Sequence, residues 1–421
     1  MPSVYFQTFG CQMNSADSDS LLLALANRGW RQAPSPEDAA LIIVNTCSVR
    51  EHAETRARAR IAEFAAVKRR LPGRRLWVIG CMAERLGARL RESMPVVDAV
   101  IGAPELADPE AVLDRHLGDD PREDPSPIEP KVSEFVPVMR GCNNFCAYCI
   151  VPFVRGREAS EKAETIVAAL SARVARGVRE VTLLGQNVNS YRDGGIDFPA
   201  LLRGVASIDG LSRIRFLTSH PKDCTEELIR AMAENAKICR HIHLPVQAGS
   251  DRILTLMNRK YTADRYRSLL AMIRRLLPDA DITTDLMVGF PSETEDEFAA
   301  TLALVEEARF TTAFMFAYSV REGTAAARLR DDLPREVKIE RLNRLIALQT
   351  AITRDGYESM VGRTAEVMVY GPVEKRGEPY LRGQDRGCKR VLVARCAASP
   401  GTVLSARILR SSGMTLVAER E

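Results

Sequence analysis

The sequence predicts an α/β fold with a small all-β domain at the C-terminal end. Strand-like and helix-like runs alternate up to residue 118, the same alternation continues with longer units from 131 to 360, and short glycine-broken β-rich runs fill residues 361–421. Such alternation is typical of parallel sheets covered by helices. A chain of 421 residues, 46% of them apolar, is long enough for two or three hydrophobic cores.

Breaks in composition set the expected domain boundaries. Residues 119–130 contain four prolines and five acidic residues, which predicts a linker. Near residues 356–362 a helical stretch over 335–353 gives way to β-rich runs. We therefore expect four segments: an N-terminal α/β domain over 1–118, a linker over 119–130, a core over 131–360 and a small β-barrel over 361–421.

The strands of the two α/β segments can be placed from their apolar runs. In the first segment we expect parallel strands at residues 4–8, 41–46, 76–80 and 98–102. In the core we expect six strands, at residues 135–139, 180–184, 214–218, 241–245, 282–288 and 313–318. A capping box over Ser292 to Glu295 and a cap at Thr262 mark two helix starts. Six strand–helix units predict a partial (β/α)6 barrel with its chemistry at the carboxyl ends of the strands.

The ten cysteines are the main evidence for chemistry. The chain begins at Met1 without a basic and apolar leader and has no run of about eighteen apolar residues, so we expect a cytoplasmic protein that does not bind a membrane. In a reducing cytoplasm grouped cysteines are better interpreted as metal or cluster ligands than as disulfides.

Three cysteines lie close together directly after the first core strand. Cys142, Cys146 and Cys149 have the spacing C-x-x-x-C-x-x-C. Three thiolates can hold three irons of a 4Fe-4S cluster and leave the fourth iron open for a reactant. A zinc site is the alternative, but it would need a fourth ligand, and the closest histidines, His116 and His220, are distant in sequence.

Three further cysteines are dispersed, yet each follows an expected strand of the first segment. Cys11, Cys47 and Cys81 would share the carboxyl edge of a parallel sheet, where ligands of open α/β sheets gather. The alternative is three unrelated cysteines at turns. The remaining cysteines show no such placement and are expected to be small buried residues or bystanders: Cys224, Cys239, Cys388 and Cys396.

The net charge of +4 is modest, but its distribution is uneven. Residues 361–421 contain eleven Lys/Arg against six Asp/Glu. Local positive charge of this kind suits a phosphate backbone, and a solvated basic surface is the alternative.

Taken together, the motifs resemble the methylthiotransferase family of radical S-adenosylmethionine enzymes, and within it the MiaB type. The resemblance covers nearly the whole chain, in the order N-terminal cluster domain, radical core and small TRAM barrel. Residues 15–16, which follow the first cysteine motif, depart from the sequence pattern of the family. The matching stretches are residues 8–14, 45–51, 141–146, 150–158, 184–191, 243–247 and 289–294.

This resemblance implies a reaction and its cofactors. One S-adenosylmethionine would methylate sulfur carried by the N-terminal cluster, and a second would furnish a radical that removes hydrogen from carbon 2 of N6-(dimethylallyl)adenosine at position 37 of tRNA. The product would carry a methylthio group on that carbon. Two 4Fe-4S clusters are implied, one held by Cys11, Cys47 and Cys81, and a second, which coordinates S-adenosylmethionine, by Cys142, Cys146 and Cys149.

Polar and aromatic residues near strand ends are candidates for cofactor or substrate contacts. Tyr148 resembles the residue that packs near the adenine of S-adenosylmethionine in this superfamily. Gln186, Asn187, Gln247 and Asp285 lie at or near strand ends and are further candidates, although each could instead satisfy loop backbone.

The resemblance also implies partners. These are the anticodon stem-loop of tRNA, a low-potential electron donor such as flavodoxin or ferredoxin, and a sulfur donor; the protein is expected to be a monomer. Sibling methylthiotransferases that act on threonylcarbamoyl-adenosine in tRNA or on a ribosomal protein aspartate remain alternatives. So does a non-catalytic RNA-binding iron-sulfur protein, whereas an electron carrier would need clusters with four cysteine ligands.

Overall fold

The computed structural model describes residues 2–48, 51–118, 124–129, 131–394 and 396–421, so half of the predicted linker lies outside the described residues. The chain forms two compact units. The first comprises Met1–Pro130, Phe135–Phe145 and Cys149–Ala159, and the second comprises Lys131–Glu134, Cys146–Tyr148 and Ser160–Glu421. Two segments that follow the linker therefore belong with the N-terminal unit.

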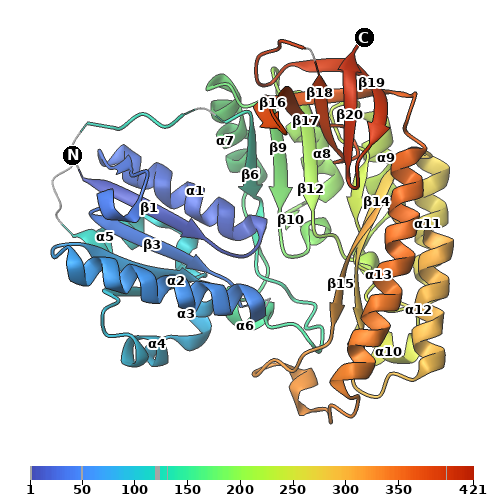
Figure 1. Ribbon diagram of the computed structural model, residues 1–421, viewed down its shortest axis with the longest axis horizontal. Coiled ribbons are helices and arrows are strands. Elements are labelled where there is room, and N and C mark those ends of the chain that lie inside the picture. Colours follow the sequence, from blue (N-terminus) through green and yellow to red (C-terminus); the bar gives the residue numbers. More distant parts are fainter. Residues whose placement is uncertain (1, 49–50, 119–123, 130, 395) are drawn as a thin grey trace. The chain divides into compact units, whose positions relative to one another are not determined.

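The first unit is built on a five-stranded parallel sheet with the order β2-β1-β3-β4-β5 (Figure 1). Its strands are β1 Ser3–Thr8, β2 Arg31–Gln32, β3 Leu41–Thr46, β4 Arg75–Gly80 and β5 Ala99–Gly102. Its helices are α1 Gln12–Asn27, α2 Glu51–Arg70, α3 Cys81–Leu86, α4 Ala88–Ser93, α5 Pro109–Leu117 and α6 Val151–Arg155. The four strands predicted for this segment are confirmed.

Both faces of this sheet are buried, which is why its central strands are continuous apolar runs. Ile42 and Val44 of β3 pack into a core with residues of α2, α3 and α4. Leu41 and Ile43 point to the opposite face and pack with residues of α1 and α5. Successive strand residues alternate between faces, so one run of six residues supplies two cores.

The second unit contains the C-terminal barrel and the core strands, except that residues 135–137 of the first core strand are assigned to the first unit. The core strands form two three-stranded sheets of order β12-β9-β6 and β13-β14-β15. Their bounds are β6 Ser133–Pro137, β9 Glu180–Leu184, β12 Arg213–Leu217, β13 His241–His243, β14 Asp281–Val288 and β15 Thr312–Ala317. The predicted partial barrel is confirmed. The strand predicted over 241–245 ends at His243, and Pro245 just beyond has no N–H to donate to a neighbouring strand.

Helices alternate with the core strands as predicted. They are α7 Ala163–Ala175, α8 Phe198–Ala206, α9 Glu226–Glu234, α10 Asp251–Leu256, α11 Ala263–Leu276, α12 Glu295–Ala308 and α13 Arg335–Glu358. The Thr262 side chain accepts a hydrogen bond from the Arg265 N–H, which confirms the predicted cap of α11. Within the described chain, no helix combines the length and apolar composition that a membrane crossing requires.

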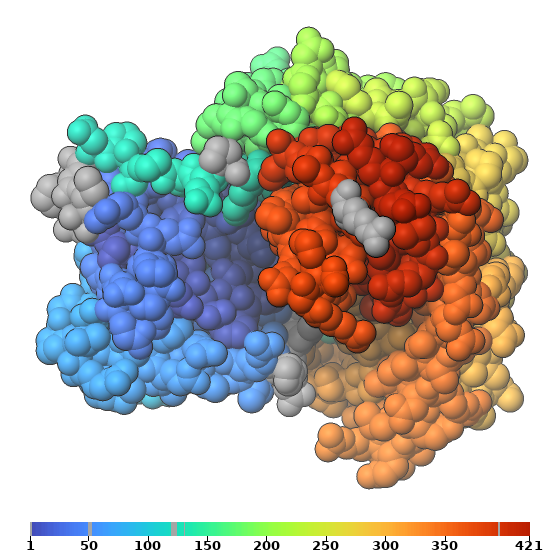
Figure 2. Space-filling model, turned by 45° about the horizontal axis from the view of Figure 1, so that its top comes forward, coloured from blue at the N-terminus to red at the C-terminus, as the bar shows by residue number. Residues whose placement is uncertain are grey.

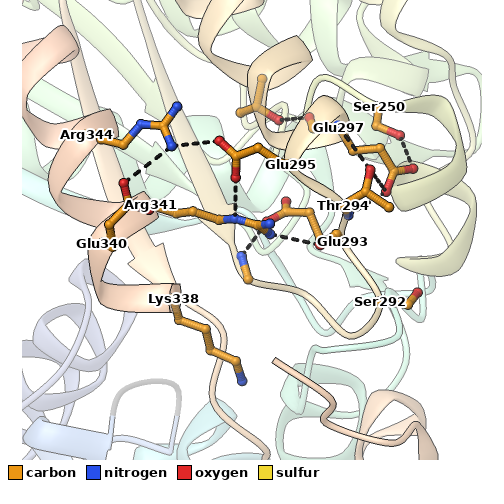
Figure 3. A network of polar contacts seen from close by, with 12 residues as sticks. Ser250, Ser292, Glu293, Thr294, Glu295, Glu297, Lys338, Glu340, Arg341 and Arg344 are labelled. Carbon is orange, nitrogen blue, oxygen red and sulfur yellow. Dashed lines mark hydrogen bonds and ion pairs between the residues drawn. The ribbon is translucent and has the colours of Figure 1, made fainter. Parts of the chain in front are cut away.

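The capping box predicted over Ser292 to Glu295 is wrong by two residues. The box pairs Thr294 with Glu297 at the start of α12 (Figure 3). Ser292 has the same sequence spacing to an acidic residue, but its φ of 65° is left-handed, whereas an N-cap residue is normally extended. Spacing alone did not distinguish the two positions.

The last sixty residues form the predicted small all-β barrel. The strands are β16 Thr364–Lys375, β17 Glu378–Gln384, β18 Arg390–Ala394, β19 Val403–Ser411 and β20 Thr415–Arg420. They close in the order β16-β17-β18-β20-β19, and the β18–β20 pair is parallel. Alternate residues such as Val367, Val369, Val391 and Val393 fill its interior.

This barrel is held against the amino ends of the core strands, where Figure 2 shows it in orange and red beside the green and yellow core. Arg213 at the start of β12 donates to the Gln384 carbonyl at 2.8 Å. Arg215 donates to the Asp385 carbonyl at 2.7 Å and to the Glu180 carboxylate at 2.8 Å. The barrel therefore occupies the amino ends and leaves the carboxyl ends of these strands for the candidate site.

Candidate functional site

Cys11, Cys47 and Cys81 lie where the sequence predicted, at the carboxyl edge of the first sheet. They follow β1, β3 and β4, which are neighbours in the sheet. Cys11 is the N-cap residue of α1, and Cys81 is the first residue of α3. Gly10, at φ +118°, passes so close to Cys47 that a Cβ on it would lie 2.8 Å from the Cys47 Cβ. The structure therefore brings the loop of Cys11 against Cys47.

A buried arginine lies near this group. Burial raises the pKa of the Cys81 thiol to about 11, the Arg155 guanidinium lowers it, and the thiols of Cys11 and Cys47 raise it further. Arg155 donates to the Asp17 carboxylate at 2.9 Å. The positive charge beside Cys81 favours its thiolate, which is the form that binds iron.

The arginine is positioned by residues that sequence reasoning did not single out. It donates to the Asn14 side-chain carbonyl at 2.7 Å, and Asp17 also accepts from Arg140 at 2.6 Å. Asn14 in turn donates to the Phe9 and Thr46 carbonyls. The signal available in the sequence was the spacing of Asn14 and Asp17, two polar residues one helical turn apart at the start of α1. The structure buries both side chains.

The second cysteine group lies on the loop between β7 (Met139–Arg140) and α6. Gly141, at φ +76°, leaves no room for a side chain, because a Cβ there would overlap the Arg157 carbonyl. The Cys142 N–H donates to the Gly156 carbonyl at 3.1 Å. The Asn143 N–H donates to the Glu158 carboxylate at 3.0 Å. These contacts fix the start of the loop that carries Cys142, Cys146 and Cys149.

In the part of the chain that the structure describes, no three His, Cys, Asp or Glu side chains are already grouped as a metal site. The assignment of six cysteines as cluster ligands therefore stays a prediction that rests on spacing and position. The donor chemistry fits, because three thiolates per group is the set that leaves one iron of a 4Fe-4S cluster open.

Cys146 is contacted by a residue that the sequence analysis missed. The Arg259 guanidinium donates to the Cys146 Sγ at 3.3 Å and approaches the Tyr148 hydroxyl at 3.5 Å. The Ala147 N–H donates to the Met257 carbonyl at 2.9 Å, which ties the cysteine loop to the residues after α10. A lone arginine in a loop gave no sequence signal.

The predicted polar candidates lie along the carboxyl ends of the core strands. Asn187 is fully buried and its side-chain amide donates to Asp223 at 2.7 Å, while its side-chain oxygen and that of Gln186 have no hydrogen-bond partner among the described residues. The Gln247 N–H donates to the Asp285 carbonyl at 2.9 Å. The structure thus brings Gln247 and Asp285 together. Buried side-chain oxygens are normally hydrogen-bonded, so those of Gln186 and Asn187 are candidates to accept a hydrogen bond from a ligand.

An exposed aromatic residue lies beside Asp285. Asp285 and Phe314 are direct partners across β14 and β15. The His243 Nε2 lies 3.4 Å from the Asp285 carboxylate, and the Phe314 ring meets the His243 ring edge-on with centroids 5.9 Å apart. Phe314 is 51% exposed, which is unusual for a phenylalanine on a strand. A half-exposed ring flanked by polar groups suits the stacking and edge recognition of a nucleobase.

Two family patterns match the chain. That of the Radical SAM superfamily matches residues 136–305, and that of the Uncharacterized protein family UPF0004 matches residues 3–102. They cover the core and the N-terminal sheet, which are the two segments that carry the cysteine groups.

Several curated relatives are similar along nearly their whole length, and each is named tRNA-2-methylthio-N(6)-dimethylallyladenosine synthase. The Geobacter metallireducens protein is 44% identical over 99% of this chain and 98% of its own. The Desulfitobacterium hafniense protein is 42% identical over 98% of this chain and 96% of its own. The Syntrophotalea carbinolica protein is 44% identical over 91% of this chain and 92% of its own.

Solved structures share the fold at low identity. The radical S-adenosylmethionine methyltransferase TsrM from Kitasatospora setae, with cobalamin and a [4Fe-4S] cluster bound, has a TM-score of 0.57 at 14% identity and covers 75% of each chain. The cobalamin-dependent S-adenosylmethionine radical enzyme OxsB has a TM-score of 0.52 at 11% identity, covering 83% of this chain and 56% of that chain. At such identities the likeness concerns the fold alone.

Proposed function

The chain belongs to the family of the tRNA-2-methylthio-N(6)-dimethylallyladenosine synthases, and we propose that it attaches a methylthio group to carbon 2 of N6-(dimethylallyl)adenosine at position 37 of tRNA. The observation that carries this proposal is the likeness to relatives of that name at 42–44% identity over nearly the full length of both proteins. The match to the Radical SAM superfamily over residues 136–305 supports a radical reaction.

Two groups of cysteines are proposed to hold the cofactors. When bound, a 4Fe-4S cluster with S-adenosylmethionine supplies the one-electron chemistry that removes hydrogen from an unreactive carbon. The shared sheet edge supports the first set, and the C-x-x-x-C-x-x-C loop supports the second. The proposed ligands are Cys11, Cys47 and Cys81 for the first cluster, and Cys142, Cys146 and Cys149 for the cluster that binds S-adenosylmethionine.

The substrate adenine is proposed to bind on the β13–β15 face. Phe314 offers an exposed ring on which the base can stack, and His243 and Asp285 can hydrogen-bond to its edge. Anticodon-loop bases can be splayed out of their stack, so a pocket of this kind can receive one. We assign Gln186, Asn187 and Gln247, together with Tyr148, to contacts with S-adenosylmethionine or substrate.

The C-terminal barrel is proposed to hold the tRNA backbone. Basic residues are spread over its surface, and Lys/Arg contacts to phosphates give sequence-independent affinity. Among the described residues of the barrel, two basic side chains do not contribute, because Arg386 donates to the Ile238 carbonyl and Lys389 is paired with Asp281. The exposed basic residues are Arg363, Lys375, Arg376, Arg382, Arg390, Arg407, Arg410 and Arg420.

Further partners follow from the reaction. The cluster needs a low-potential electron donor, for which flavodoxin or ferredoxin is suitable, and the transferred sulfur needs a donor. We propose that the protein acts as a monomer in the cytoplasm, where tRNA is modified.

The proposed function is tested by removing the gene from its host and analysing nucleosides of bulk tRNA by mass spectrometry. We expect the methylthio group to disappear while N6-(dimethylallyl)adenosine accumulates, and a plasmid copy of the gene should restore it. Unchanged methylthio content in the deletion strain would show that the substrate assignment is wrong.

The ligand assignment has its own test. After anaerobic reconstitution, changing Cys142, Cys146 and Cys149 together to alanine should remove about half of the bound iron, because one of two equal clusters is lost. Changing Cys224 to alanine is the matched control, since this cysteine is buried but lies in neither group. Loss of all the iron, or of none, would contradict the two-cluster arrangement.

A further inference from the structure

Arg259 carries a buried guanidinium that pairs with no carboxylate of the described residues. Six arginines among the described residues are buried. Five of them are ion-paired, and Arg259 is the one for which the described residues supply no carboxylate within ion-pair distance. The five pairs are Arg28 with Glu110 and Asp114, Arg155 with Asp17, Arg213 with Glu366, Arg215 with Glu180, and Arg341 with Glu293.

The guanidinium is nevertheless held in one orientation. Its Nε donates to the Tyr261 hydroxyl at 2.8 Å and its Nη2 donates to the Pro245 carbonyl at 2.7 Å. Its Nη1 is directed at the Cys146 Sγ, 3.3 Å away. The planar fork of arginine therefore points one nitrogen at a proposed ligand sulfur while the others are fixed by oxygen acceptors.

Neither of the two closest oxygen acceptors carries a negative charge. Pro245 contributes a backbone carbonyl, and burial raises the pKa of the Tyr261 hydroxyl to about 12, so this phenol is neutral at physiological pH. Tyr261 donates its own proton to the Val246 carbonyl at 2.9 Å. A buried charge without a counter-charge is strongly unfavourable, so we expect this cation to face an anion that the described residues do not themselves provide.

We propose that Arg259 is the counter-cation of the cluster held by Cys142, Cys146 and Cys149, and that its N–H···S bond to Cys146 raises the reduction potential of that cluster. The inference rests on the proposed function for the presence of the cluster. A cluster with three thiolate ligands is anionic and gains one more negative charge on reduction, so a fixed cation beside it stabilises the reduced form more than the oxidised form. The electron comes from the external low-potential donor, and no proton moves on Arg259.

The test is a redox titration of the reconstituted full-length protein, with the reduced cluster followed by electron paramagnetic resonance. The signal that changes when S-adenosylmethionine is added identifies the relevant cluster. In Arg259→Gln we expect the ratio of reduced to oxidised cluster at a fixed potential to fall about tenfold, which is a shift of about 59 mV to lower potential for one electron. Lys260→Gln is the matched control, because it removes an adjacent but exposed cation.

Each outcome decides the question. A lowered potential in Arg259→Gln, with Arg259→Lys nearer to the wild type, supports the inference. An unchanged reduction potential in a variant with a full cluster overturns the inference. That result would be expected if Arg259 bound only the carboxylate of S-adenosylmethionine. If Arg259→Gln loses the cluster, restored iron content in Arg259→Lys supports a charge role and continued loss overturns it. Wild-type protein without a signal that responds to S-adenosylmethionine would instead contradict the proposed function.

Discussion

One buried ion pair contributes to the attachment of the C-terminal barrel to the core. Glu180 at the start of β9 is 2% exposed and accepts hydrogen bonds from Arg215 at 2.8 Å and from the Tyr370 hydroxyl at 2.7 Å. Arg215 also donates to the Asp385 and Arg386 carbonyls of the β17–β18 loop. Glu180 of β9 and Arg215 of β12 thus join two core strands to β16 and to the β17–β18 loop of the barrel.

Replacing either Glu180 or Arg215 should lower the free energy of unfolding strongly. Replacing both should lower it by less than the sum of the two single losses. Arg215→Met leaves the Glu180 carboxylate buried without its counter-charge, and Glu180→Gln leaves the guanidinium in the same state, so each should lower the free energy of unfolding by about 3–5 kcal/mol. In the double variant neither charge is stranded. We expect its loss to be smaller than the sum of the two single losses by about 1–3 kcal/mol.

The assay is urea unfolding followed by far-ultraviolet circular dichroism, with the free energy taken from midpoint and slope. Tryptophan fluorescence is an internal control, because Trp30 and Trp77 both lie in the first unit and should report an unchanged transition. Arg203→Ala, which removes a surface ion pair with Glu227, should cost less than about 1 kcal/mol. Additive losses in the double variant, within about 0.5 kcal/mol, would refute the coupling.

Three further outcomes are expected. Burial lowers the pKa of His220 to about 2, below its usual value of about 6.5. Below pH 6.5 the unfolded chain therefore binds a proton that the folded chain does not. The free energy of unfolding should fall as the pH drops, by about 2 kcal/mol at pH 5. Urea midpoints at pH 5 and 7.5 should show a smaller drop for His220→Asn; an equal drop would contradict this. Gly141→Ala should reduce iron per chain after reconstitution, because the left-handed φ and the Arg157 carbonyl leave no room for a Cβ, and full loading would disprove it. Phe314→Ala should raise the KM for tRNA about tenfold, as expected for loss of a base stack, whereas Phe314→Tyr should not; an unchanged KM would exclude stacking.

The strands could be predicted because burial on both faces leaves a strong local signal. The run from Leu41 to Thr46 is a strand at those same residues, since its four apolar residues, 41–44, alternate between the two cores. The cysteine positions could be predicted for a related reason: each of Cys11, Cys47 and Cys81 directly follows such a strand or the short turn after it. A parallel sheet then places them on one edge.

Other features depend on contacts between residues distant in sequence, and the sequence could not reveal them. Arg259 and Phe314 belong to no recognisable motif. Their proposed roles follow from the residues that the fold places beside them, Cys146 for Arg259 and His243 for Phe314. The basic C-terminal segment was counted as one surface, although Lys389 is buried against Asp281. Charge counts do not distinguish a cation that binds RNA from one that holds two parts of a protein together.

The central claim is that this chain uses two cysteine-held clusters to methylthiolate tRNA. The most direct measurement incubates the anaerobically reconstituted protein with S-adenosylmethionine, a low-potential reductant and tRNA that carries N6-(dimethylallyl)adenosine, and then quantifies the nucleosides by mass spectrometry. We predict 2-methylthio-N6-(dimethylallyl)adenosine with the wild-type protein and none with Cys146→Ala or Cys47→Ala. Product formation by either cysteine variant, or no product from a wild-type protein that holds both clusters, would contradict the claim.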